Sequence, residues 1–384
     1  MWLYLFLFVA FFDLHAQFPM LSPFALSLGA APSFIGLILG VYSITHLPGN
    51  VMAGYAIDRY GSKPFIISSL ILAGIVLIFQ SYVTDPWQLL IIRSISGFVL
   101  AFLSPACLSL LAKLAKDRIH QGKLMAGNGL VHTLASVVSP AAGAYLVAKV
   151  GFATSFSVLG WILILTGTLS IFGIKDVKGA PNAAVVASET PILPDPAVRE
   201  EMADGSVSVP WLFFGIPMAI SCSQGILFFE LPLIKASQDS ILTSGILFSL
   251  VSLGALLTLS MLFLNKMSPF LRTLGGCLAL ALVFYGMSVH WALPLYVSLF
   301  LIGMAKGIAL PAMSTLLASM TDSNRYGRVF SVLSISSSLG AFFGPILAGQ
   351  FRLDISPYFI AFLGLMLALM ILPMHKFKSP VTAS

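Results

Sequence analysis

Long apolar runs alternate with short polar breaks along the whole chain. Within each run the apolar residues are continuous, which favours helices over the alternating strands of a membrane barrel. Each run has about the 20 residues that a helix needs to cross a hydrocarbon core of about 30 Å. Twelve membrane-spanning helices are therefore predicted, at residues 2–22, 33–53, 64–83, 87–111, 124–148, 153–174, 210–234, 243–264, 272–289, 292–318, 328–351 and 355–373.

The composition agrees with an all-α integral membrane protein. Hydrophobic residues make up 58% of the 384-residue chain and charged residues 9%, whereas an ordinary soluble domain has about 25% charged residues. A water-soluble fold must display polar groups on its surface, and this chain has too few of them. The first run contains Asp13 and His15 and lacks an A-x-A cleavage site, so we interpret it as a retained spanning helix.

The longest polar break, residues 175–209, separates six predicted helices from six. It contains four prolines, several acidic residues and few large apolar ones, which predicts a flexible cytoplasmic linker. The linker divides an N-terminal bundle, residues 1–174, from a C-terminal bundle, residues 210–384.

The two bundles share an ordered set of positions. At shifts of 205 or 206 residues, Gly97 and Pro140 of the first bundle correspond to Gly303 and Pro345 of the second. The bundles are therefore predicted to be two parallel six-helix repeats. This architecture is typical of secondary transporters, whose substrate site lies near the midplane between the repeats.

The distribution of basic residues predicts the orientation in the membrane. Of the 20 Lys and Arg residues, fifteen fall in one alternate set of loops, three in the other set and two inside helices. Basic loops stay on the cytoplasmic side, so we expect both termini in the cytoplasm of a cell with a bacterial-type inner membrane. The net charge of +6 is then a topology signal, and nucleic acid is not an expected partner.

Four charged residues lie inside predicted helices, where charges are expensive and usually functional. They are Asp13, Arg93, Glu230 and Lys306, on the first, fourth, seventh and tenth helices. Asp13 lies near the midplane within reach of Arg93. Desolvation favours a neutral carboxyl and a nearby guanidinium favours a carboxylate, so a proton carrier and a static ion pair both fit this pair. Glu230 lies near a helix end, either at the rim or with a functional role, and Lys306 either binds an anionic group or extends towards the cytoplasm.

Other chemistry is sparse. Cys107, Cys222 and Cys277 lie inside predicted helices at no metal-ligand spacing, and His15 and His132 are interpreted as packing residues. The sequence has no hydrolase elbow, metal-ligand cluster or phosphate-binding glycine loop. We therefore expect no enzyme activity, no cofactor or metal and no use of ATP. The expected partners are a small-molecule substrate, protons and the lipid bilayer, with the chain acting as a monomer.

The stretch GYAIDRYGSK at 54–63 is similar to a signature of the major facilitator superfamily, G-x-x-x-D-R-x-G-R-[KR], between its second and third helices. Ser62 replaces the first basic residue of the signature, and the matching residues are Gly54, Asp58, Arg59, Gly61 and Lys63. In the fourth helix RSISG resembles the family's R-x-x-x-G element. We expect Gly54 and Gly61 to shape a tight turn between the helices.

The fifth helix carries ASVVSPAAGA, which resembles the family's antiporter-associated G-x-x-x-G-P-x-x-G-G. Pro140 and Gly143 match, whereas Ser139 is one of three residues that stand in for glycines. In the eleventh helix Gly344 and Pro345 occupy the corresponding positions. Both prolines are expected to bend their helices.

The chain thus resembles a twelve-helix member of this superfamily, in the drug:proton antiporter branch, over its whole length. The resemblance implies that the first, fourth, seventh and tenth helices line a central cavity. It also implies that Asp58 faces the start of the eleventh helix, where Arg328 can add an ion pair that acts as a cytoplasmic latch; a solvated turn is the alternative. The expected function is proton-coupled export of a small amphipathic compound by alternating access. Uptake of a nutrient or metabolite, lipid flipping and a non-transporting sensor are the alternatives.

Overall fold

The computed structural model describes residues 2–114, 118–174, 211–261, 264, 267–321 and 326–371. The predicted linker at 175–209 lies outside the described residues. Within this part of the chain the secondary structure consists of helices and turns, with no strand. The fold is therefore all-α, as the sequence predicts.

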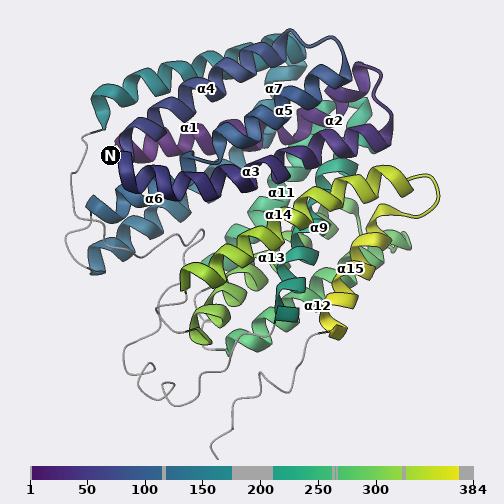
Figure 1. The fold of residues 1–384 in the computed structure, drawn as a ribbon. Coiled ribbons are helices and arrows are strands. Elements are labelled where there is room, and N and C mark those ends of the chain that lie inside the picture. The colour runs from purple at the N-terminus through teal and green to yellow at the C-terminus, as the bar shows by residue number, and fades with distance from the viewer. Residues whose placement is uncertain are drawn as a thin grey trace, which may run out of the picture.

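The first half of the chain contains the helices drawn in purple to blue-teal in Figure 1. They are α1 (Trp2–Ala16), α2 (Phe18–Ser27), α3 (Pro32–Tyr60), α4 (Lys63–Ser81), α5 (Pro86–Leu100), α6 (Leu103–Leu114) and α7 (Arg118–Gly173). The second half, in teal-green to yellow, contains η1 (Trp211–Phe214), α9 (Gly215–Glu230), η2 (Leu231–Leu233), α10 (Lys235–Asp239), α11 (Ile241–Ser260), α12 (Pro269–Ser288), α13 (Leu295–Ser319), α14 (Tyr326–Phe351) and α15 (Pro357–Ile371).

Each of the twelve predicted runs has a helical counterpart in this element order. Among the described residues, nine helical segments are long and apolar enough to span a membrane, and the bent pair α1–α2 makes a tenth. One of the nine, within α7, contains two spans, because Gly151 has a φ of 79° and breaks the helix between them. The remaining span is the shorter apolar helix α15.

The first span is bent by 40° between α1 and α2. Gln17 separates the two helices, and Pro19 lies at the start of α2. A proline cannot donate a backbone hydrogen bond to the preceding turn, so a helix commonly bends or restarts there. The bend leaves Gln17 at the centre of the span, where its side chain can reach neighbouring helices.

The signature segment is mostly helical, which corrects the expectation of a glycine-shaped turn. Gly54 lies inside α3, and a Cβ added there would meet nothing within 4 Å. Only Gly61, with a φ of 87°, has the left-handed conformation that favours glycine, and it ends α3. The turn therefore consists of Gly61 and Ser62, and Pro64 follows at the start of α4.

The two halves pack against each other near one end of the molecule, through α3 with α14 and α7 with α11. We call this the contact end. A Cβ added at Gly36 would clash with the backbone of Pro345, and one added at Gly40 would clash with Phe342. On the other side of the interface, a Cβ at Gly245 would clash with the backbone of Pro140. The contact end is thus built from backbones that approach closely because side chains are absent.

The opposite end, which carries the 54–63 segment, is the signature end. Here the side chains of α3 are open: Val51, Met52 and Tyr55 are 74%, 54% and 70% exposed. The glycine contacts of α3 with α14, at Pro32, Gly36 and Gly40, lie in its first third. These contacts lie at the contact end, and several α3 side chains of the signature end are exposed.

Candidate functional site

Three polar side chains form a chain of hydrogen bonds inside the first half. The Nε2 amide of Gln17 donates to Oδ2 of Asp13 at 3.0 Å, and Nη1 of Arg93 donates to Oε1 of Gln17 at 3.1 Å. Among the described residues Asp13 and Arg93 form no direct ion pair. The expected contact is therefore replaced by a bridge through Gln17, which sequence reasoning missed.

This site, which we call the Asp13 site, is enclosed by protein. Asp13 is 2% exposed and Arg93 is 4% exposed. The guanidinium of Arg93 lies over the ring of Tyr42, with its Cζ 4.7 Å from the ring centroid, which is a favourable cation–π distance. Oδ1 of Asp13 and Nε of Arg93 are buried without a hydrogen-bond partner in the described structure. Such orphaned polar atoms are costly unless another group satisfies them.

The second half contains a related but simpler arrangement. Nζ of Lys306 on α13 donates to Oε1 of Gln224 on α9 at 2.6 Å. In both halves, then, a glutamine on the first helix of the repeat accepts a hydrogen bond from a cation on the fourth. Gln224 and Lys306 are both half-buried, whereas Asp13 and Arg93 are buried. The structure therefore places both cations beside neutral amides.

Aromatic rings join the halves between the contact end and these polar residues. Phe18 stacks on Phe228 with ring centroids 4.1 Å apart, and Phe248 lies 5.6 Å from Phe228. His15 packs edge-on against Phe18 at 5.2 Å and against His132 at 5.1 Å. The two histidines, which the sequence suggested were scattered packing residues, are neighbours in the first half, and His15 contacts Phe18 of this aromatic layer.

Glu230 is part of a separate ion pair at the contact end. Arg352 donates two hydrogen bonds of 3.1 Å to the carboxylate of Glu230, one from Nε and one from Nη2. Nη2 also donates to the carbonyl of Leu233 at 3.1 Å, so the pair ties the end of α9 and η2 to the end of α14. A bidentate arginine–carboxylate pair is a strong and directional contact. Glu230 is buried at 8% exposure, and sequence analysis missed its partner Arg352.

At the signature end the structure describes only one side of the predicted latch. Asp58 and Arg59 lie exposed in the last turn of α3, where Nη1 of Arg59 is 3.4 Å from the hydroxyl of Tyr55. Lys63 begins α4. Arg328 lies within α14, but its side chain is outside the described residues, so the latch stays a prediction.

The motif residues around the two prolines lie at helix interfaces. Gly143 packs against the backbone of Ala16 beside the bend of the first span, and Gly344 packs against Cys222 of α9. The hydroxyl of Ser139 donates to the carbonyl of Ala135 one turn earlier. Pro140 and Pro345 lie at the junction of the halves, where Gly245 and Gly36 approach their backbones closely; their role in bending these helices stays a prediction.

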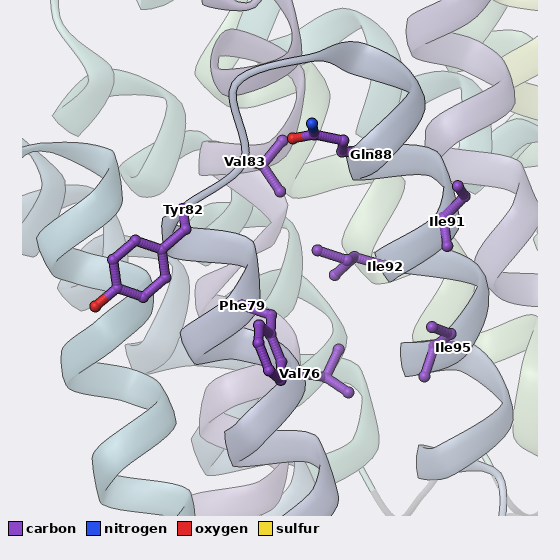
Figure 2. Close-up of a pocket in the computed structure, with 8 residues that line it drawn as sticks. All are labelled: Val76, Phe79, Tyr82, Val83, Gln88, Ile91, Ile92 and Ile95. Carbon is purple, nitrogen blue, oxygen red and sulfur yellow. The ribbon is translucent and has the colours of Figure 1, made fainter.

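An apolar groove on the outside of the first half is distinct from these sites. Figure 2 shows its walls, which come from the end of α4 and the start of α5: Val76, Phe79, Tyr82, Val83, Gln88, Ile91, Ile92 and Ile95. Its side chains are almost all apolar, as expected of a surface that faces lipid. Among the described residues no group of three or more His, Cys, Asp or Glu side chains can hold a metal ion.

Comparison with known proteins identifies relatives along the whole chain. The family model described as "Major Facilitator Superfamily" matches residues 3–289 and 271–384. The multi-drug resistance efflux pump PmrA of Streptococcus pneumoniae is 22% identical over 334 residues, which cover 83% of this chain and 80% of that protein. An uncharacterized MFS-type transporter of Methanocaldococcus jannaschii is 28% identical over 160 residues, and this match spans 41% of each protein.

Solved structures share the fold at low identity. The inward open conformation of the xylose transporter XylE from E. coli superposes with a TM-score of 0.71 and 15% identity, over 96% of this chain and 94% of that one. At this identity the likeness concerns the fold alone.

Proposed function

The chain belongs to the major facilitator superfamily, and we propose that it is a proton-coupled exporter of a small amphipathic compound. As a member of this family it is a multi-pass membrane transporter of small molecules and not an enzyme. Coupling to protons, the direction of transport and the cell membrane as its location are parts of the proposal. We propose that it acts as a monomer with both termini in the cytoplasm.

The observation that carries the proposal is the enclosed Asp13 site. A carboxylate at 2% exposure with one oxygen lacking a partner is stabilised when it binds a proton, because protonation removes a desolvated charge. Gln17 can serve both states, since its amide holds Asp13 while its carbonyl holds Arg93. When the halves rock and the site opens to water, the solvation of the carboxylate changes, so its proton affinity changes with it.

The orientation of the contact end and the signature end bears on alternating access. If the basic loops are cytoplasmic, the signature end faces the cytoplasm and the closed contact end faces outward. The structure then corresponds to an inward-facing state. Substrate would enter from the cytoplasm between the halves, and protonation of Asp13 from outside would follow release in the outward-facing state.

Two observations bear on the direction of transport. The relative PmrA is named as an efflux pump and matches over 83% of this chain, and the fifth helix carries the antiporter-type sequence around Pro140. Both observations favour export over uptake. A lipid flippase or a sensor has no comparable support.

The test is flux in inside-out vesicles that contain the purified chain. The vesicles are given an acidic lumen and offered two impermeant amphiphiles, a naphthalenesulfonate and a trimethylnaphthylammonium ion. We expect at least one to accumulate, with alkalinisation of the lumen reported by a trapped pH dye. Accumulation only with an alkaline lumen would indicate uptake, and the absence of flux under either gradient would contradict a transport function.

The matched variant is Asp13→Asn, which keeps the size of the side chain but cannot exchange a proton. We expect it to bind the same compound and to lose gradient-driven accumulation. Proton-coupled flux retained in Asp13→Asn would remove Asp13 from the mechanism.

A further inference from the structure

The bend in the first span joins two segments that have different neighbours. The first segment, α1, carries Asp13 and packs against α7 of its own half, whereas α2 also contacts α9, η2 and α11 of the second half. Phe18 is the first residue of α2, and its ring stacks on Phe228 of the second half with the centroids 4.1 Å apart. The bend therefore lies between Asp13 and the ring contact that joins the halves.

Gln17 occupies the bend and is hydrogen-bonded on both sides of it. Its backbone N–H donates to the carbonyl of Asp13 at 3.3 Å, and its carbonyl accepts from the N–H groups of Met20 and Leu21 at 3.1 Å. Gln17 is 2% exposed, and its side-chain amide bridges Asp13 and Arg93. Water cannot replace these contacts in an enclosed site, so a displacement of the amide either moves the bend or breaks a buried hydrogen bond.

This bridge suits an uncharged Asp13. A carboxylate and a guanidinium attract each other and commonly form a direct bidentate pair, but here the amide of Gln17 lies between Asp13 and Arg93. Asp13 is 2% exposed, and enclosure favours the uncharged carboxyl group. When Asp13 loses its proton, its attraction to Arg93 increases, and a direct pair between them displaces the amide.

We propose that Gln17 is a positioning residue that couples the protonation of Asp13 to the closure of the contact end. With Asp13 protonated, the bridge keeps Gln17 in place and Phe18 stacked on Phe228. With Asp13 ionised, the direct pair with Arg93 displaces Gln17, and the bend carries Phe18 away from Phe228. This inference rests on the proposed function, because it assigns a further residue to the proton coupling of the same transporter.

The inference has a direction: protonation favours the closed contact end. The groups near Asp13 that can also respond to pH are Arg93 on α5, Tyr42 on α3, and the neighbouring imidazoles of His15 on α1 and His132 on α7. An arginine stays charged and a tyrosine stays neutral below about pH 9. The two imidazoles are therefore the competing source of a pH response.

The experiment measures the distance between the halves at the contact end. Cysteines replace the exposed residues Ser27, at the end of α2, and Ser240, just before α11, in a background in which the three native cysteines are alanine. Both cysteines are spin-labelled, and pulsed EPR gives the distance distribution in the full-length chain in lipid nanodiscs without substrate. From about pH 9 to about pH 5, we expect the ratio of the short-distance to the long-distance population to rise at least about fivefold, from the exchange of one charge-assisted hydrogen bond.

The variants test each step of the coupling. Gln17→Leu and Gln17→Met remove the bridge at similar side-chain volume, so the response to pH should fall below about twofold. Phe18→Ala should reduce it as well, because the ring no longer carries the movement to Phe228. The matched controls are Gln88→Leu and Phe79→Ala, at exposed residues of the outer groove (Figure 2), and both should respond like the wild type. The melting temperature reports whether each variant is folded.

The outcomes separate this inference from the proposed function. A wild-type response in a folded glutamine variant or in Phe18→Ala overturns the coupling role of Gln17, even if the vesicles show proton-driven export. A wild type without a response to pH, or a response that persists in Asp13→Asn, overturns it too, because the imidazoles are intact in that variant. A response that requires Asp13, Gln17 and Phe18 supports the inference even if the vesicles show uptake.

Discussion

The two halves share one plan for their polar interior but use it differently. In each half a glutamine on the first helix accepts a hydrogen bond from a cation on the fourth, Gln17 from Arg93 and Gln224 from Lys306. The first half adds Asp13 and encloses the whole site, whereas Gln224 and Lys306 of the second half are half-buried. The shared arrangement thus gives an enclosed site in one half and a more accessible one in the other.

The largest expected difference between the halves is the cost of removing the cation. Arg93→Ala leaves the buried Asp13 without its compensating charge, and an uncompensated buried charge costs about 3–5 kcal/mol. Lys306→Ala removes a half-buried cation that donates to a neutral amide, so the expected loss is below about 1 kcal/mol. Thermal unfolding in detergent measures both.

The double variant Asp13→Asn with Arg93→Ala is the control for this comparison. It should recover much of the stability that Arg93→Ala loses, because no charge is then left buried. Similar losses in Arg93→Ala and Lys306→Ala would mean that the enclosure of the first site has no energetic consequence.

The glutamines provide a second, smaller contrast. Gln17→Ala leaves Asp13 and Arg93 each without a partner in an enclosed site, at a cost of about 1–3 kcal/mol. Gln224→Ala exposes Lys306 to a half-open surface where water can replace the amide, so the melting temperature should change little. An equal effect of the two substitutions would contradict the division into an enclosed and an accessible site.

Asp58 extends the contrast to the signature end. The corresponding segment of the second half's sequence, residues 261–268, has Lys266 but no acidic residue. Asp58→Asn removes the charge that is expected to favour the start of α14, so we predict flux reduced by about tenfold with an unchanged melting temperature, since the residue is exposed. Asp239→Asn, also exposed, is the control and should transport normally; wild-type flux in Asp58→Asn would make Asp58 a topogenic turn residue.

The least perturbing test asks whether the two repeats are parallel and oriented as proposed. Single cysteines are placed in a background in which Cys107, Cys222 and Cys277 are replaced by alanine. We expect an impermeant reagent to label positions 85, 149 and 239 from outside, and positions 63 and 267 only after the membrane is opened. Labelling of positions 63 and 85 from the same side would refute the topology.

Sequence patterns predicted the fold well because the bilayer imposes a simple rule on helix length. Every predicted span has a helix, and even the single-residue break at Gly151 falls in the predicted gap between the fifth and sixth spans. The bend at Gln17 was not predicted, since Pro19 marks where a helix can bend but not that it does. The helical state of Gly54 was also missed, because glycine signals a turn only where a left-handed conformation is required.

The sites were predicted less completely, since they depend on contacts between distant helices. Asp13 and Arg93 stood out because charges in apolar segments are rare, and Lys306 and Glu230 did so for the same reason. Gln17 and Gln224 are uncharged and gave no such signal. Arg352 was assigned to a loop, and its bidentate contact with Glu230 depends on the register between α9 and α14. The approach of His15 to His132 likewise depends on how α1 packs against α7.

The close approach of Gly36 and Gly40 to α14 has a mechanical consequence. Asp58 lies roughly 27 Å further along α3 than Gly40, at about 1.5 Å per residue. If α3 rotates by about 20° relative to α14 about these glycine contacts, Asp58 at its far end moves by roughly 9 Å. Such a rotation meets little steric resistance, because no side chains interlock where the two backbones touch. A methyl group added at Gly36 would clash with the backbone of Pro345 and would therefore hinder this rotation.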